Sequence, residues 1–140
     1  MDPGVLFQIA TAACLPPWLL LIAAPRWRFT QRIAGFVMPL LFCAAYMGVF
    51  LHEFHRSSAS GITLESVMVL FARPWVALGG WIHYLAFDLF VGAWEVRDAR
   101  RLEVPHLQTI PFLLLTLMFG PIGLACYLLF RLAKKREAEL

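Results

Sequence analysis

The sequence predicts an all-α integral membrane protein: a bundle of four transmembrane helices with a short interfacial helix between the second and third. Of its 140 residues, 61% are hydrophobic and 15% are charged, whereas soluble domains contain about 45–50% apolar and about 25% charged residues. The mean hydropathy is +0.72. Four apolar runs approach the ~20 residues that cross a bilayer. No segment between them is long enough to bury its own core, so we expect a single transmembrane domain over residues 1–140.

The first predicted span covers residues 5–24. It ends at Pro25-Arg26-Trp27-Arg28, where two arginines add charge and a tryptophan is suited to the membrane interface. The second span covers residues 33–51 and ends at His52-Glu53-Phe54-His55. Two histidines three residues apart on a helix could share a metal ion. We favour the alternative, a solvated helix end. The three cysteines lie in apolar runs without metal-type spacing, so no metal site is expected.

Residues 62–73 have apolar side chains at positions 64, 67, 68 and 71, which is a helical period. This segment is too short to cross a bilayer, so it predicts an interfacial helix, with a re-entrant one as the alternative. The third span covers residues 76–94, and residues 95–106 are predicted to be a charged linker. The fourth span covers residues 111–130, although Gly120-Pro121-Ile122-Gly123 interrupts its middle. Four spans place both termini on one side of the membrane.

The basic residues leave the orientation of this four-span topology undecided. Positive residues favour cytoplasmic loops, and here each side receives six. The side of the termini has Arg56, Arg73, Arg131, Lys134, Lys135 and Arg136, and the other side has Arg26, Arg28, Arg32, Arg97, Arg100 and Arg101. If the first hairpin dominates, its three arginines place the termini outside the cytoplasm.

His83 and Asp88 near the middle of the third span are the candidate catalytic residues. A charged residue at the bilayer centre costs about 2.5–3.5 kcal/mol on insertion scales, so such groups usually have a partner or a function. At 100° per residue, Asp88 shares a face with Trp81, Tyr84 and Glu95, while His83 lies on another face about 140° away. The structural alternative is that Asp88 only hydrogen-bonds Tyr84 or Thr116 to hold the bundle together.

Polar groups at similar depth in all four spans predict a pocket on the side of the termini; these groups are Gln8, Tyr46, His83 and Tyr127. An interfacial belt of amphipathic residues is the alternative. We expect Trp81, Tyr84 and Tyr46 to shape the pocket. Gly92 either leaves room for a flat ligand or allows close helix packing. No nucleotide-binding, nucleophile-elbow or nucleic-acid-binding motif is present.

Three stretches together resemble the neoxanthin-synthase-like family, named after the abscisic-acid-deficient-four protein of plants. They are Trp18-Leu-Leu-Leu to Pro25-Arg-Trp-Arg, Trp81-Ile-His-Tyr-Leu-Ala-Phe-Asp-Leu-Phe-Val-Gly, and Phe119-Gly-Pro-Ile-Gly. The resemblance implies a small four-span membrane protein linked to carotenoid metabolism, with His83 and Asp88 as the polar positions of its third span. Ala93 replaces the arginine associated with the plant motif, which weakens the expectation of an identical substrate.

In plants the family is tied to converting violaxanthin, a 5,6-epoxide, into the allenic neoxanthin. Such an isomerisation requires one acid and one base but no redox cofactor, and we expect none. Asp88 would be the acid and His83 the base, or the reverse. The competing hypothesis is a non-catalytic pigment-binding scaffold or an assembly subunit of a membrane complex. Expected partners are membrane lipid, a carotenoid or other apolar polyene, and further copies of the chain in a homo-oligomer. The expected location is a bacterial inner membrane or a photosynthetic membrane.

Overall fold

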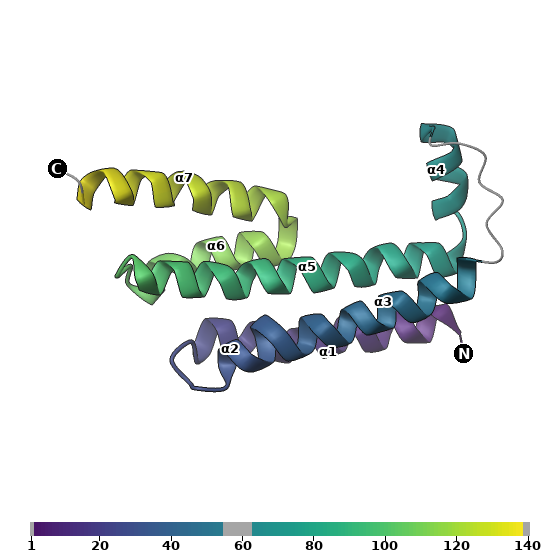
Figure 1. Cartoon of the computed structure of the whole chain (residues 1–140), viewed down its shortest axis with the longest axis horizontal. Helices are drawn as coiled ribbons and strands as arrows, with labels where there is room; N and C mark the ends of the chain where they lie inside the picture. The colour runs from purple at the N-terminus through teal and green to yellow at the C-terminus, as the bar shows by residue number, and fades with distance from the viewer. Residues whose placement is uncertain (1, 55–62, 139–140) are drawn as a thin grey trace.

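The computed structural model describes residues 2–54 and 63–138, which fold entirely into helices and connecting turns (Figure 1). In chain order they are α1 (Pro3–Ala23), α2 (Thr30–Arg32), a π-helical turn (Ile33–Val37), α3 (Met38–Phe54), α4 (Leu64–Phe71), α5 (Pro74–Arg101), α6 (His106–Phe119) and α7 (Pro121–Ala138). Three helices are long and apolar enough to cross a membrane: Pro3–Ala23, Thr30–Glu53 and Pro74–Arg101. The predicted all-α fold is therefore confirmed over the described residues.

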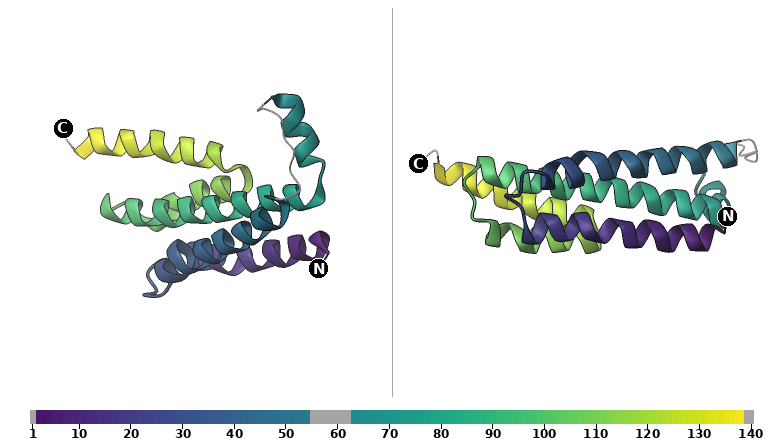
Figure 2. Two further views of the ribbon diagram at one scale, coloured as in Figure 1. Left: turned by 45° about the vertical axis from the view of Figure 1, so that its right-hand side comes forward. Right: turned by 90° about the horizontal axis from the view of Figure 1, so that it is seen from below.

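The three long helices lie side by side, with α5 packed against both α1 and α3 (Figure 2). Helix α1 begins at Asp2, whose carboxylate accepts a hydrogen bond of 2.9 Å from the Gly4 amide. This bond satisfies one of the free amides of the first turn. The buried core contains Trp18 and Leu21 of α1 and Leu89 of α5. Helix α5 therefore forms the centre of the fold.

The outward faces of these helices are apolar. Leu19 of α1 is 63% exposed, Phe36 64% and Phe87 of α5 56%. In water, so much exposed apolar surface would cause association. The same pattern is expected where the solvent is the hydrocarbon of a bilayer.

The predicted fourth span, residues 111–130, does not form as one helix. Helix α6 ends at Phe119, Gly120 adopts a positive φ of 44°, and α7 returns antiparallel to α6 beside one half of α5 (Figure 1). Fourteen residues of α6 rise only about 21 Å at 1.5 Å per residue, which is short of the hydrocarbon thickness. The two termini consequently lie at opposite ends of the bundle rather than on one side as predicted.

The end of the third predicted span also differs from the sequence-based prediction. Helix α5 continues to Arg101, so the predicted charged linker at residues 95–106 is largely helix. Its Glu95 and Asp98 are buried.

The short predicted helix at residues 62–73 is present as α4, which begins with a capping box between Thr63 and Ser66. Helix α4 runs across the direction of the long helices at the N-terminal end of α5 (Figure 1).

Candidate functional site

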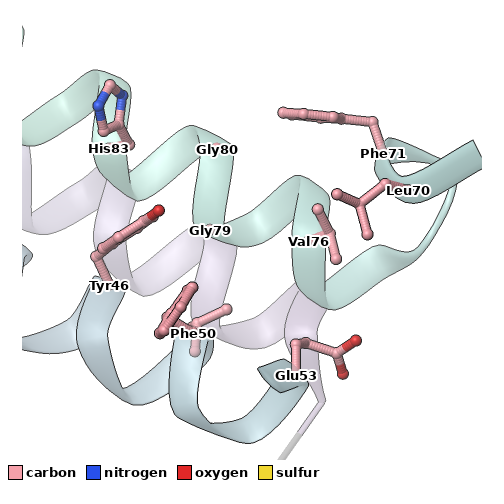
Figure 3. A pocket seen from close by; sticks show the side chains of 10 residues that line it. Tyr46, Phe50, Glu53, Leu70, Phe71, Val76, Gly79, Gly80 and His83 are labelled. Atoms are coloured by element: carbon pink, nitrogen blue, oxygen red, sulfur yellow. The ribbon is translucent and has the colours of Figure 1, made fainter. Parts of the chain in front are cut away.

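His83 lies in a groove between α3, α4 and the first half of α5. The groove has a volume of about 660 Å³ and is lined mainly by apolar side chains, with Tyr46, Glu53 and His83 as its polar members. The His83 ring centroid is 5.9 Å from that of Tyr46 on α3 and 4.5 Å from that of Phe87. Figure 3 shows Tyr46 and His83 reaching this space from neighbouring helices. We call it the α3–α5 groove.

An ion pair closes one end of the α3–α5 groove. Arg73, directly before α5, pairs with Glu53 at the end of α3, and the His52 ring lies 4.5 Å from the ring of Trp75. His52 Nδ1 is also 3.2 Å from Glu53 Oε1. His52 is exposed whereas Glu53 is only 8% exposed, so the helix end that we predicted to be solvated is exposed at one of these two positions. Among the described residues no three His, Cys, Asp or Glu side chains gather as a metal site, and His55 lies outside those residues.

A second groove, here the α1–α5 groove, lies on the other side of the contact between Phe71 and Gly80. Its volume is about 730 Å³, and Trp81, His83 and Tyr84 line it together with Phe71. Phe71 extends from α4 toward Gly80 (Figure 3), where a Cβ atom would come within 2.7 Å of the Phe71 ring. Since Phe71, Gly80 and His83 line both grooves, one aromatic side chain separates two adjoining spaces.

Hydrogen bonding and stacking orient the aromatic side chains of the α1–α5 groove. Trp81 Nε1 donates to Thr11 Oγ1 of α1 at 2.9 Å. The Trp81 ring lies 5.3 Å from that of Tyr84. The Tyr84 hydroxyl donates to the Leu117 carbonyl of α6 at 3.0 Å. These contacts connect α5 to both α1 and α6, and they leave Trp81 and Tyr84 with defined orientations.

Asp88 lies one turn beyond Tyr84, at the tip of the α6–α7 hairpin. A Cβ atom on Gly120 would be 3.0 Å from both Asp88 carboxylate oxygens. Tyr84, one turn earlier on α5, donates its hydroxyl proton to the Leu117 carbonyl. Asp88 Oδ2 is buried and has no hydrogen-bond partner among the described residues. The carboxyl group thus has one buried oxygen that no described protein group satisfies.

Two further carboxylates on α5 hold the hairpin in place. Thr116 Oγ1 donates to Glu95 Oε1 at 2.9 Å. Tyr127 donates to Asp98 Oδ2 at 3.0 Å, and Arg131 Nε donates to the same oxygen at 2.6 Å. Sequence analysis placed Glu95 on the same helix face as Asp88 but missed these roles, because it assigned residues 95–106 to a linker. Their spacing from Asp88 of seven and ten residues, two and nearly three helical turns, is the signal that could have identified them.

The structure therefore distributes the predicted site residues over four places. Tyr46 and His83 share the α3–α5 groove, and Trp81, His83 and Tyr84 share the α1–α5 groove. Asp88 adjoins Tyr84 but has no contact with His83 among those described, as their angular separation on the helix predicted. Gly92 lines neither groove: it is buried beneath Trp18, and a Cβ there would be 2.6 Å from that ring.

The family comparison covers all of these positions. A family model described as ABA DEFICIENT 4-like matches residues 5–127. The chain belongs to this ABA DEFICIENT 4-like family. Membership indicates a carotenoid-related membrane protein. The match includes the α3–α5 groove, most of the α1–α5 groove, Asp88 and most of the hairpin. It stops before Arg131, the cation that pairs with Asp98. No curated protein and no solved structure matches the chain.

Proposed function

We propose that this ABA DEFICIENT 4-like protein is a membrane-embedded isomerase of epoxycarotenoids that works without a cofactor. The observation that supports this most directly is Asp88, a carboxyl group with an unpartnered buried oxygen. It lies one turn from Tyr84, which lines the apolar α1–α5 groove together with His83. Apolar grooves of 300–1,000 Å³ with few polar groups are typical of small-molecule sites. Family membership supports the carotenoid substrate class.

The reaction requires one proton to be delivered and one to be removed. Protonation of the epoxide oxygen breaks its bond to the ring carbon that bears the polyene, and the oxygen becomes a hydroxyl group. A base takes the hydrogen from the adjacent polyene carbon, and the electron pair of that C–H bond forms the second double bond of the allene. Substrate and product have the same composition, so neither an oxidant nor a reductant takes part.

The residues around the α1–α5 groove can supply this chemistry. Asp88 would deliver the proton to the epoxide oxygen. His83, which lines the same groove, would accept the proton from the polyene carbon as a neutral imidazole. Trp81 and, from the α3–α5 groove, Tyr46 would position the end ring by stacking.

One observation favours a second candidate function, a pigment-binding scaffold without catalysis. His83 and Asp88 lie on different faces of α5, and His83 is exposed. A scaffold requires only the apolar grooves and the aromatic side chains, because no proton is transferred. In that case, replacing the Asp88 carboxyl with an amide would change pigment retention or stability but not the set of carotenoids formed.

A carotenoid-producing bacterial host that makes a 5,6-epoxycarotenoid provides the test. The chain is expressed beside Asp88→Asn and His83→Gln, with Glu65→Gln as a control that removes an exposed carboxyl group of α4 outside both grooves. At equal membrane levels, we expect a new carotenoid in the parent and the control and at least a tenfold lower yield in both site variants. Unchanged pigments together with co-purifying carotenoid would support the scaffold. Unchanged pigments without bound carotenoid would contradict both functions.

A further inference from the structure

The α6–α7 hairpin redistributes the positive charge of the bundle. Because α7 returns to the end where α5 finishes, parts of five helices meet there. His106 Nε2 is 2.9 Å from the Ile22 carbonyl, Arg97 Nη1 donates to Gln31 at 3.0 Å, and Arg131 pairs with Asp98. These contacts bring together the ends of α1, α5 and α7 and the beginnings of α2 and α6.

This end contains ten of the twelve Lys and Arg residues of the sequence. We call them the basic rim: Arg26, Arg28, Arg32, Arg97, Arg100, Arg101, Arg131, Lys134, Lys135 and Arg136. At the opposite end the described residues include Arg73 as the one Lys or Arg residue, together with Asp2 at the start of α1, Glu53 in α3 and Glu65 in α4. The six-to-six balance of the four-span topology therefore becomes strongly asymmetric.

Most side chains of the basic rim for which exposure is described are accessible to an anionic membrane surface. Arg26, Arg28, Arg32, Arg100 and Arg101 are all exposed. Glu103, in the turn after α5, is exposed as well, whereas two other acidic groups near the rim are engaged by the hairpin. Glu95 is fully buried and accepts a hydrogen bond from Thr116, and Asp98 forms an ion pair with Arg131. Each Lys or Arg near an anionic leaflet contributes about 1 kcal/mol of attraction.

We propose that the basic rim contacts the anionic headgroups of the cytoplasmic leaflet, so that the chain crosses the membrane three times with its N-terminus outside and its C-terminus in the cytoplasm. Positive residues near the ends of spans are retained on the cytoplasmic side during insertion. The hairpin enters from the cytoplasmic side and returns to it, and its tip at Gly120 lies beside Asp88.

This orientation assigns both grooves to the outer half of the membrane. The grooves are lined by residues from the beginnings of α1 and α5 and the end of α3, which are all at the end away from the rim. Helix α4 lies there too, with Leu64 and Val69 each 71% exposed, as expected for a helix in the outer interface. If the proposed function holds, the polyene enters from the outer leaflet.

Labelling of introduced cysteines in intact bacterial cells tests the orientation independently of any carotenoid chemistry. Glu65→Cys reports on the groove end, Arg100→Cys on the rim, and a cysteine appended after Leu140 on the C-terminus. The unsubstituted chain gives the background from its own three cysteines. We expect a membrane-impermeant maleimide to label Glu65→Cys in intact cells, and the other two positions only after lysis.

Two results would overturn the proposal. Labelling of Arg100→Cys but not Glu65→Cys in intact cells would mean the reverse orientation. Labelling of Glu65→Cys and the appended cysteine on the same side, with Arg100→Cys on the other, would mean that α6 and α7 together cross the membrane. Neither result depends on whether the chain converts carotenoids, so failure of the orientation and failure of the proposed function remain separable.

Discussion

The turn between α6 and α7 leaves no space for a side chain at Gly123. A Cβ atom there would overlap the backbone nitrogen and Cα of Thr116, and backbone atoms cannot escape by changing rotamer. The Gly123→Ala substitution must therefore push α7 away from α6. This movement also disturbs Thr116, whose hydroxyl donates to the buried Glu95 carboxylate.

The expected loss follows from three contributions. Overpacking costs about 1–3 kcal/mol, and loss of a hydrogen bond to a charged group costs about 1.5–3 kcal/mol. Alanine recovers about 0.5–1 kcal/mol relative to glycine within a helix. We expect Gly123→Ala to lower the free energy of unfolding by roughly 2–4 kcal/mol, after allowing for partial relaxation of the hairpin.

This loss is measured by unfolding the purified protein in detergent, once by heating and once by adding denaturant. Gly48→Ala is the matched control, because a Cβ atom at Gly48 of α3 meets no atom within 4 Å. The control should be as stable as the parent or slightly more stable. If Gly123→Ala unfolds at the same midpoint as Gly48→Ala, the close packing of the hairpin described above is incorrect.

Two further substitutions probe the groove and the hairpin anchor. Gly80→Ala would place a Cβ atom 2.7 Å from the ring of Phe71, so we expect this side chain to move. The amount of bound carotenoid should then change at least twofold, while the unfolding midpoint stays nearly constant. Unchanged carotenoid binding would argue that Phe71 does not separate the two grooves. Asp98→Asn removes the charge paired with Arg131 and should cost about 1.5–3 kcal/mol of stability. In unfolding assays beside Glu65→Gln, equal stability would show that this ion pair does not anchor α7.

The periodicity of the third span was sufficient to predict how its side chains are distributed. His83, Phe87 and Phe90 are exposed, whereas Glu95 is buried and Asp88 lies against the hairpin tip. A helix repeats every 3.6 residues whatever its neighbours are, so its two faces can be assigned from spacing alone. The two grooves could not be assigned in this way, because they depend on where Phe71 of α4 meets Gly80.

The hairpin was not predictable from hydropathy, because one apolar helix of 20 residues and two shorter antiparallel arms have the same average. The local signal was Gly120-Pro121, which permits a positive φ and then starts a new helix. Glu95 and Asp98 resembled linker residues because charge usually marks the end of a span. Their partners Thr116, Tyr127 and Arg131 are 21 to 33 residues away, and sequence spacing does not reveal such pairs.

The central claim is that Asp88 transfers a proton in a cofactor-independent isomerisation. The most direct measurement incubates the purified protein in lipid vesicles with a 5,6-epoxycarotenoid, without added cofactors and without oxygen, and analyses the pigments by liquid chromatography with mass detection. We expect the parent and Glu65→Gln, but not Asp88→Asn, to form a product of identical mass and different retention time. Absence of conversion, a product of different mass, or equal conversion by Asp88→Asn would contradict it.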